Sequence, residues 1–368
     1  MWMDGKRLGV VALAAGLAAG VAGHANAAEK LVFASYISEA FTSSKADIWF
    51  MDEVEKRSNG EITFERYFSG SLLSGTDLYP GLMQSAADIV AGVPAAYNRN
   101  DFPLSNVSLP FITESPIASG LAFTELMQNS EALRAEYEKF NAKHLYSRSN
   151  PENVAWLSTP IRTVEDFQGK KIRAVLTIAN AVEQLGATSV SMAMAEAVDA
   201  LDRGMIDGFT AVPFDASFSV GLDETSKYVS DFGRFGASMI TQVSFNLNRW
   251  NSLSEEHRAL ISQVADEAAE YFTAVLLPEA MAESVDKLCK EMSSGKIETI
   301  VFSADEAAKV NEKARQAVHD EWVSWAAQRA AGVDTRAMLD SYIELVGKYE
   351  AETSYTSGLD AAVAQCGS

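Results

Sequence analysis

Arg173 is the residue whose type and setting best suit the capture of a small anion. It lies in a short predicted strand at residues 172–175, directly after the turn-forming segment 167–171. A side chain near the end of a strand points to one face of the sheet, and a guanidinium offers two parallel N–H donors that match a carboxylate. The spacing alone favours a simpler alternative, a surface arginine on a solvated strand edge. The sequence therefore predicts a carboxylate site only if this face borders a cleft.

Aromatic and polar residues in predicted loops could complete such a site, because open α/β sheets bind ligands at the loops that follow their strands. We expect aromatic side chains to cover the carbon skeleton of a ligand, and the candidates are Tyr36, Tyr97, Trp156, Phe209 and Phe214. We expect polar groups to orient the ligand, and the candidates are Ser35, Arg148, Asn150 and Thr210. Packing in a core would explain each aromatic residue at least as well as ligand contact.

Signatures of catalysis are sparse. After residue 27 the histidines are His144, His257 and His319, and no two have the spacing of a helix-borne metal pair. The sequence lacks H-E-x-x-H, a G-x-S-x-G elbow, a P-loop and a G-x-G-x-x-G turn. Acidic pairs such as Glu255-Glu256 are typical of a helix start. We therefore expect no enzyme activity, no catalytic residue, no metal-ligating residue and no cofactor. The sequence does not decide whether a metal ion accompanies a ligand.

Charge and cysteine content narrow the function further. The formal net charge is −20 at pH 7, from 50 acidic and 30 basic residues. Such a chain repels phosphate backbones, so nucleic-acid binding is not expected, and an anionic ligand would need a locally positive site. Two cysteines leave two alternatives open: a disulfide that ties Cys366 in the tail to the helix of Cys289, or two inert thiols.

Residues 1–27 have the pattern of a signal peptide. Lys6 and Arg7 form a positive start, a small and apolar run follows from 8 to 23, and Ala25-Asn26-Ala27 suits a signal peptidase. The apolar run is short for a membrane span, although an uncleaved anchor is an alternative. We expect cleavage near Ala27 and a soluble mature protein outside the cytoplasm.

Two segments alternate strand, helix and strand, the pattern of a parallel βαβ unit. One runs from about residue 30 to 67, and the other from about 172 to 191. Residues 82–88 and 201–207 also resemble each other, because in both a helix end leads through a turn into a short strand. Helical periodicity dominates after Asn251. The sequence therefore predicts two similar α/β lobes followed by helices.

Three segments in the middle of the chain carry a recognisable pattern. Residues 164–173 are V-E-D-F-Q-G-K-K-I-R, 185–192 are L-G-A-T-S-V-S-M, and 196–208 are E-A-V-D-A-L-D-R-G-M-I-D-G. Together they resemble the corresponding motifs of the DctP-type periplasmic solute-binding proteins of tripartite ATP-independent periplasmic (TRAP) transporters. Ser189 and Val198 stand where the family usually has a proline and a tyrosine.

The resemblance covers about residues 31–349 and implies the fold. This would be an α/β, two-lobed periplasmic-binding-protein (flytrap) fold with a long lobe-spanning helix and C-terminal helices. The implied parts are lobe I at 28–150, with about 241–275 returning to it; lobe II at 151–240, with about 276–330; and a C-terminal helical tail at 331–368 that packs on the lobes.

The resemblance also places Arg173 at the position of the family's arginine that binds a substrate carboxylate in the interlobe cleft. Two departures concern the ligand. Thr159 stands where some sialic-acid-binding members have a second arginine, and residues 209–212 (F-T-A-V) stand where those members have an asparagine. We therefore expect an organic acid with an apolar or aromatic body rather than a sugar acid.

The function implied by the resemblance is transport. The protein would capture a small organic acid and deliver it to a TRAP membrane permease, whose small and large subunits are the expected partners. Two alternatives remain: a ligand-sensing module of a signalling receptor, and a secreted hydrolase-like enzyme. Transport and sensing begin with the same capture step, so the sequence does not separate them.

Overall fold

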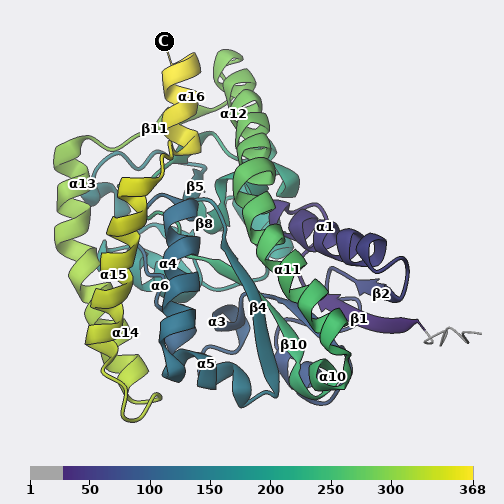
Figure 1. Cartoon of the computed structure of the whole chain (residues 1–368). Coiled ribbons are helices and arrows are strands. Elements are labelled where there is room, and N and C mark those ends of the chain that lie inside the picture. The colour runs from purple at the N-terminus through teal and green to yellow at the C-terminus, as the bar shows by residue number, and fades with distance from the viewer. Residues whose placement is uncertain (1–27, 368) are drawn as a thin grey trace, which may run out of the picture.

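The computed structural model describes residues 28–367, apart from the side chains at positions 176 and 195, and contains two sheets surrounded by helices (Figure 1). The predicted signal peptide, residues 1–27, lies outside the described residues. Each sheet has helices on its faces, which is the layered arrangement expected of a two-lobed α/β protein. The predicted fold class is confirmed.

The first sheet has the strand order β2-β1-β3-β10-β4. β1 pairs in parallel with β2 and β3, whereas β10 is antiparallel to both β3 and β4. The strands are β1 (Glu29–Ser35), β2 (Ile62–Tyr67), β3 (Ile89–Gly92), β4 (Ala142–Ser149) and β10 (Ile240–Asn246). The helices of this part are α1 (Thr42–Arg57), α2 (Leu78–Met83), α3 (Pro94–Tyr97), α4 (Pro116–Asn129), α5 (Glu131–Glu138) and α10 (Leu247–Ser252), with a 3-10 turn at Leu104–Asn106.

The second sheet has the strand order β11-β9-β5-β8-β6-β7. β6 is parallel to both β7 and β8, and β5 is antiparallel to β8 and β9. The strands are β5 (Asn153–Leu157), β6 (Lys171–Arg173), β7 (Thr188–Val190), β8 (Gly208–Pro213), β9 (Tyr228–Ser230) and β11 (Glu298–Ile300). The helices of this part are α6 (Leu176–Gln184), α7 (Met194–Asp202), α8 (Phe214–Ser217) and α9 (Leu222–Thr225), with 3-10 turns at Val164–Phe167 and Phe218–Val220.

Both predicted βαβ units are confirmed, as β1-α1-β2 and β6-α6-β7. Two short connections join the sheets: β4 leads into β5, and β9 leads back to β10. We propose that the sheets are the cores of lobes I and II, with the boundaries that the sequence suggests.

A long helical segment forms a third connection between the two parts (Figure 1). It consists of α11 (Glu255–Tyr271), a π-helical turn (Phe272–Leu276) and α12 (Leu277–Ser293). Ser254 caps its start by accepting a hydrogen bond from the His257 amide at 3.1 Å. Pro278 has no N–H for the regular ladder, which accounts for the π turn just before it. α11 packs on α1 and β4, and α12 packs on α8 and α16.

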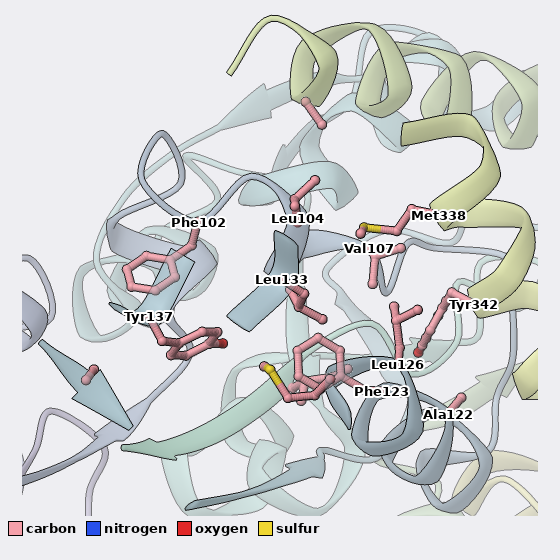
Figure 2. Packing of buried hydrophobic residues seen from close by; sticks show 14 of the residues in the cluster. Phe102, Leu104, Val107, Ala122, Phe123, Leu126, Leu133, Tyr137, Met338 and Tyr342 are labelled. Carbon is pink, nitrogen blue, oxygen red and sulfur yellow. The ribbon is translucent and has the colours of Figure 1, made fainter. Parts of the chain in front are cut away.

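The C-terminal helices touch both parts. They are α13 (Ala304–Val310), a π turn at Asn311–Arg315, α14 (Gln316–Ala327), α15 (Thr335–Glu352) and α16 (Gly358–Cys366). Figure 2 shows Met338 and Tyr342 of α15 beside Ala122 and Leu126 of α4 in a shared apolar core. α16 packs on α12, where Cys366 forms a disulfide with Cys289. Of the two alternatives left open by the sequence, the structure therefore contains the disulfide.

None of the helices between residues 28 and 367 is long and apolar enough to cross a membrane.

Candidate ligand-binding site

A cleft of about 610 Å³ lies between the two sheets and receives side chains from both parts. The first part contributes loops after β1 and β3 and the start of α1, and the second contributes the ends of β6 and β8 and helix α7. Strand ends and the helix starts beside them are the usual ligand position in open α/β sheets. The lining residues are Tyr36, Ile37, Ser38, Phe41, Ser43, Val93, Ala96 and Tyr97 from the first part; Arg173, Val175, Met194, Val198, Ala211, Pro213 and Val220 from the second; and Asn150 and Met239 from the connections.

Arg173 is held rigidly at the wall of this cleft, with only 6% of its surface exposed. Its Nη1 donates to the carbonyl oxygens of Thr210 at 3.0 Å and Ala211 at 3.2 Å, and its Nε donates to the carbonyl oxygen of Met192 at 3.4 Å. The ring of Phe209 lies beneath the guanidinium, 4.7 Å from ring centroid to Cζ. These contacts fix the side chain in one orientation before any ligand binds.

The backbone of β8 is distorted where it holds Arg173. Successive carbonyls of a regular strand point in opposite directions, yet those of Thr210 and Ala211 both face Nη1. Ala211 has a φ of 60°, a left-handed value that is costly for a residue with a Cβ, and the pairing of β5 with β8 shifts register at this point. Such strain is often found at functional sites.

The charge of Arg173 has no acidic partner within residues 28–367, and Nη2 donates no hydrogen bond to any of those residues. Burial lowers the pKa of the Arg173 guanidinium to about 10, so the group is still charged at neutral pH. A buried charge is normally paired, because desolvation is expensive. An anion from solution would supply the missing partner, and Nη2 is the nitrogen with open donors.

The rest of the cleft is uncharged and mostly apolar. Tyr36 and Tyr97 meet edge to face, with 4.8 Å between ring centroids, and Tyr97 is 53% exposed at the cleft. The Tyr36 hydroxyl accepts a hydrogen bond from the Val93 amide at 3.1 Å. Such a surface suits the carbon skeleton of a small acid better than a second charge.

Four of the ten residues that the sequence suggested line this cleft together: Arg173, Asn150, Tyr36 and Tyr97. Trp156, Phe209 and Phe214 do not, because they are fully buried in the core of the second part. Phe209 instead supports the guanidinium from within the protein. The expectation that these three rings cover the ligand is therefore corrected.

Ser35, Thr210 and Arg148 also lie outside the cleft lining. The Ser35 hydroxyl accepts from the Ile37 amide, and the Thr210 hydroxyl donates to the Val154 carbonyl at 3.1 Å. Arg148 is bound to the buried carboxylate of Asp47 at 2.7 Å. Each of these three side chains makes a polar contact within the protein, although Nε and Nη1 of Arg148 have no partner among the described residues. The Thr210 carbonyl also helps to hold Arg173.

Sequence reasoning missed the apolar residues of the second part that line the cleft, such as Val175, Met194 and Val198. Alternating apolar residues predict a strand or helix but do not distinguish a cleft wall from a core. It also missed Ser38 and Ser43, which face the cleft from the first part.

A larger hollow of about 1140 Å³ lies on the first part between α4, β4 and the long helical segment. Arg148 reaches it, but its charge is already paired with Asp47. No strand of the second sheet lines this hollow. Between residues 28 and 367 we also find no group of three or more His, Cys, Asp or Glu side chains placed to hold a metal ion. We therefore assign the candidate site to the cleft between the sheets.

Two joined α/β parts with a preformed cleft between them define the class of two-lobed solute-binding proteins. The chain belongs to one family within that class, described as bacterial extracellular solute-binding protein, family 7 (DctP), whose model matches residues 33–324. The matched region contains Arg173 and every other residue that lines the cleft.

The chain is similar to other periplasmic solute-binding proteins. It is 25% identical over 299 residues to the C4-dicarboxylate-binding periplasmic protein DctP of Rhodobacter capsulatus, covering 78% of this chain and 85% of the relative. A TRAP periplasmic solute-binding protein from Desulfovibrio salexigens superposes with a TM-score of 0.74 at 26% identity, over 89% of this chain and 98% of that chain.

A marine metagenome TRAP solute-binding protein specific for aromatic acid ligands, in complex with metahydroxyphenylacetate, superposes with a TM-score of 0.75. The two are 24% identical, over 88% of this chain and 99% of that chain. At this identity the likeness shows that the fold is shared. The predicted family is confirmed by the family model that matches residues 33–324.

Proposed function

We propose that the protein is the extracytoplasmic solute-binding subunit of a TRAP transporter and that it captures a small monocarboxylic acid with an apolar or aromatic body. The observation that carries this proposal is Arg173, a nearly buried cation with no acidic partner among the described residues, in a cleft whose other lining residues are uncharged. A cleft of about 610 Å³ is in the range that small-molecule sites occupy.

The lining favours one carboxylate over two. A second ionised group would need another cation or several donors, because burying an unpaired charge is costly. Arg173 is the one charged side chain that lines the cleft within the described part of the chain, and Arg148 is held by Asp47. The second carboxylate of a C4-dicarboxylate would therefore meet apolar side chains and neutral oxygen atoms.

At the upper end of their range, the available interactions reach the free energy of micromolar binding. A dissociation constant of 1 μM corresponds to about 8 kcal/mol. Two charge-assisted hydrogen bonds from Nη2 would contribute roughly 3–6 kcal/mol. Burial of about 100 Å² of a ligand's apolar surface against Tyr36, Tyr97 and the lobe II side chains would add about 2.5 kcal/mol.

Delivery to the small and large permease subunits is the second part of the proposal. It is supported by the family to which the chain belongs. A ligand that touches both lobes stabilises the closed arrangement over an open one, which gives the permease a surface by which to recognise the loaded protein.

A thermal-shift experiment with three probes tests the capture step. Benzoate, benzamide and succinate share an approximate size but differ in charge and shape. We expect benzoate-like monocarboxylates to raise the melting temperature, with about 2.7 kcal/mol of stabilisation at a concentration 100-fold above the dissociation constant. Benzamide and succinate should have little effect. Stabilisation by benzamide as large as that by benzoate would contradict the proposal.

A further inference from the structure

Asn150 occupies a central position between the two lobes. It follows β4, in the connection to β5, and 9% of its surface is exposed. Its backbone amide donates to the Met239 carbonyl at 2.9 Å, and Met239 lies on the other connection, between β9 and β10. Both residues line the cleft that contains Arg173. Asn150 is therefore held where the two connections run side by side.

The neighbours of the Asn150 amide fix its orientation. Nδ2 donates to the Met239 carbonyl and to the Thr241 hydroxyl oxygen, both at 3.2 Å. A backbone carbonyl can only accept, so the nitrogen must face Met239 and the oxygen must face the other way. No donor in the described part of the chain reaches Oδ1. This oxygen is also not one of the fully buried side-chain atoms that lack a hydrogen-bond partner.

We infer that Asn150 Oδ1 is a specificity-determining acceptor, which selects monocarboxylates that carry a hydroxyl or amine donor in addition to the carboxylate. This inference rests on the proposed function. Arg173 binds the carboxylate of the ligand. The fixed side-chain carbonyl oxygen of Asn150 accepts a hydrogen bond from the hydroxyl or amine of the ligand. An acid without a donor would cover Oδ1 without pairing it, and an unpaired buried acceptor loses affinity.

The same atom disfavours a second carboxylate. Two oxygen acceptors without a hydrogen between them repel each other, and the amide cannot turn its nitrogen to the ligand without losing its bonds to Met239 and Thr241. Hydroxylated monocarboxylates are thus the class that satisfies both polar groups of the cleft.

Matched pairs of acids test this inference by calorimetry. The probes are 3-hydroxybenzoate against benzoate, and mandelate against phenylacetate, with the mature wild-type protein. We expect the hydroxylated member to bind about tenfold more tightly in at least one pair. Equal affinity within both pairs would overturn the inference while leaving the proposed function intact. Failure of all four acids to bind at millimolar concentration would overturn both.

Two variants distinguish a role of Asn150 in ligand recognition from a purely structural role. Asn150→Leu keeps a similar volume but cannot accept, so it should abolish the roughly tenfold preference: the hydroxylated acid binds more weakly, and its partner binds at least as tightly as to the wild type because no unpaired acceptor is covered. Thr241→Val removes one partner of Nδ2 but keeps Oδ1, so it should retain the wild-type preference. Equal weakening of both acids by Asn150→Leu would assign Asn150 a structural role only. If either variant fails to fold, the comparison of matched acids with the wild-type protein still tests the inference.

Discussion

Replacing Arg173 by alanine should weaken the binding of an organic acid by about 2–5 kcal/mol, which is roughly 30-fold to several thousand-fold. The structure supports this magnitude because the guanidinium is 6% exposed and its Nη2 donors are open to the cleft. The fall of its pKa from 12.5 to about 10 corresponds to a burial cost on the order of 3 kcal/mol. A ligand carboxylate recovers much of that cost.

The Arg173→Lys variant is a sharper test. An ammonium retains the positive charge but cannot bond three backbone carbonyls and a carboxylate in the same plane. It should therefore also lose affinity. Thermal stability of the Arg173→Ala variant without ligand should change little, because relief of the burial cost offsets the lost hydrogen bonds to those carbonyls.

Calorimetry with the tightest-binding acid of the probe panel measures these effects. Arg162→Ala is a matched control, because Arg162 lies on the same lobe, is about half exposed and pairs with Glu298 outside the cleft. It should bind the acid as the wild type does. Unchanged affinity in both Arg173 variants, or an equal loss in Arg162→Ala, would refute a direct contact.

Three further predictions concern stability. Changing Cys289 and Cys366 to serine should cost about 4 kcal/mol, given a sequence separation of 77, and lower the melting temperature by roughly 6 °C; an unchanged melting temperature would contradict this. Asp47→Asn leaves Arg148 buried without its counter-charge and should cost about 3–5 kcal/mol in urea denaturation; a loss below 1 kcal/mol would show that the pair is dispensable. Burial raises the pKa of the Glu152 carboxyl to about 7. The protonated carboxyl therefore contributes its full stabilisation below pH 4.5, and this contribution disappears as the pH rises through 7. Glu152→Gln should therefore gain stability relative to the wild type between pH 5 and pH 8, and parallel melting curves across that range would contradict the shift.

The fold was predictable from sequence because its signals are local. The strand and helix periods around β1-α1-β2 and β6-α6-β7 lie within short windows, and parallel units of this kind assemble in few ways. The π turn before Pro278 was not predicted, because helical periodicity tolerates a single irregular turn.

The site was predictable only in part. Arg173 was predicted to line a cleft from its distinctive motif. Asn150, Tyr36 and Tyr97 were predicted from their polar or aromatic type and their position in predicted loops. Phe209 and Trp156 were misjudged because residue type does not reveal which face of a strand is buried, and both point into the core. Arg148 was misjudged for another reason: its partner, Asp47, is about 100 residues away in sequence, and no local pattern links them.

The central claim is that Arg173 binds the carboxylate of the captured acid. A crystal structure of the mature protein with its co-purified ligand tests this most directly. We expect a carboxylate oxygen about 2.7–2.9 Å from Arg173 Nη2 and the ligand's carbon skeleton against Tyr36 and Tyr97. A ligand without an acidic group, or a carboxylate bound away from Arg173, would contradict the claim.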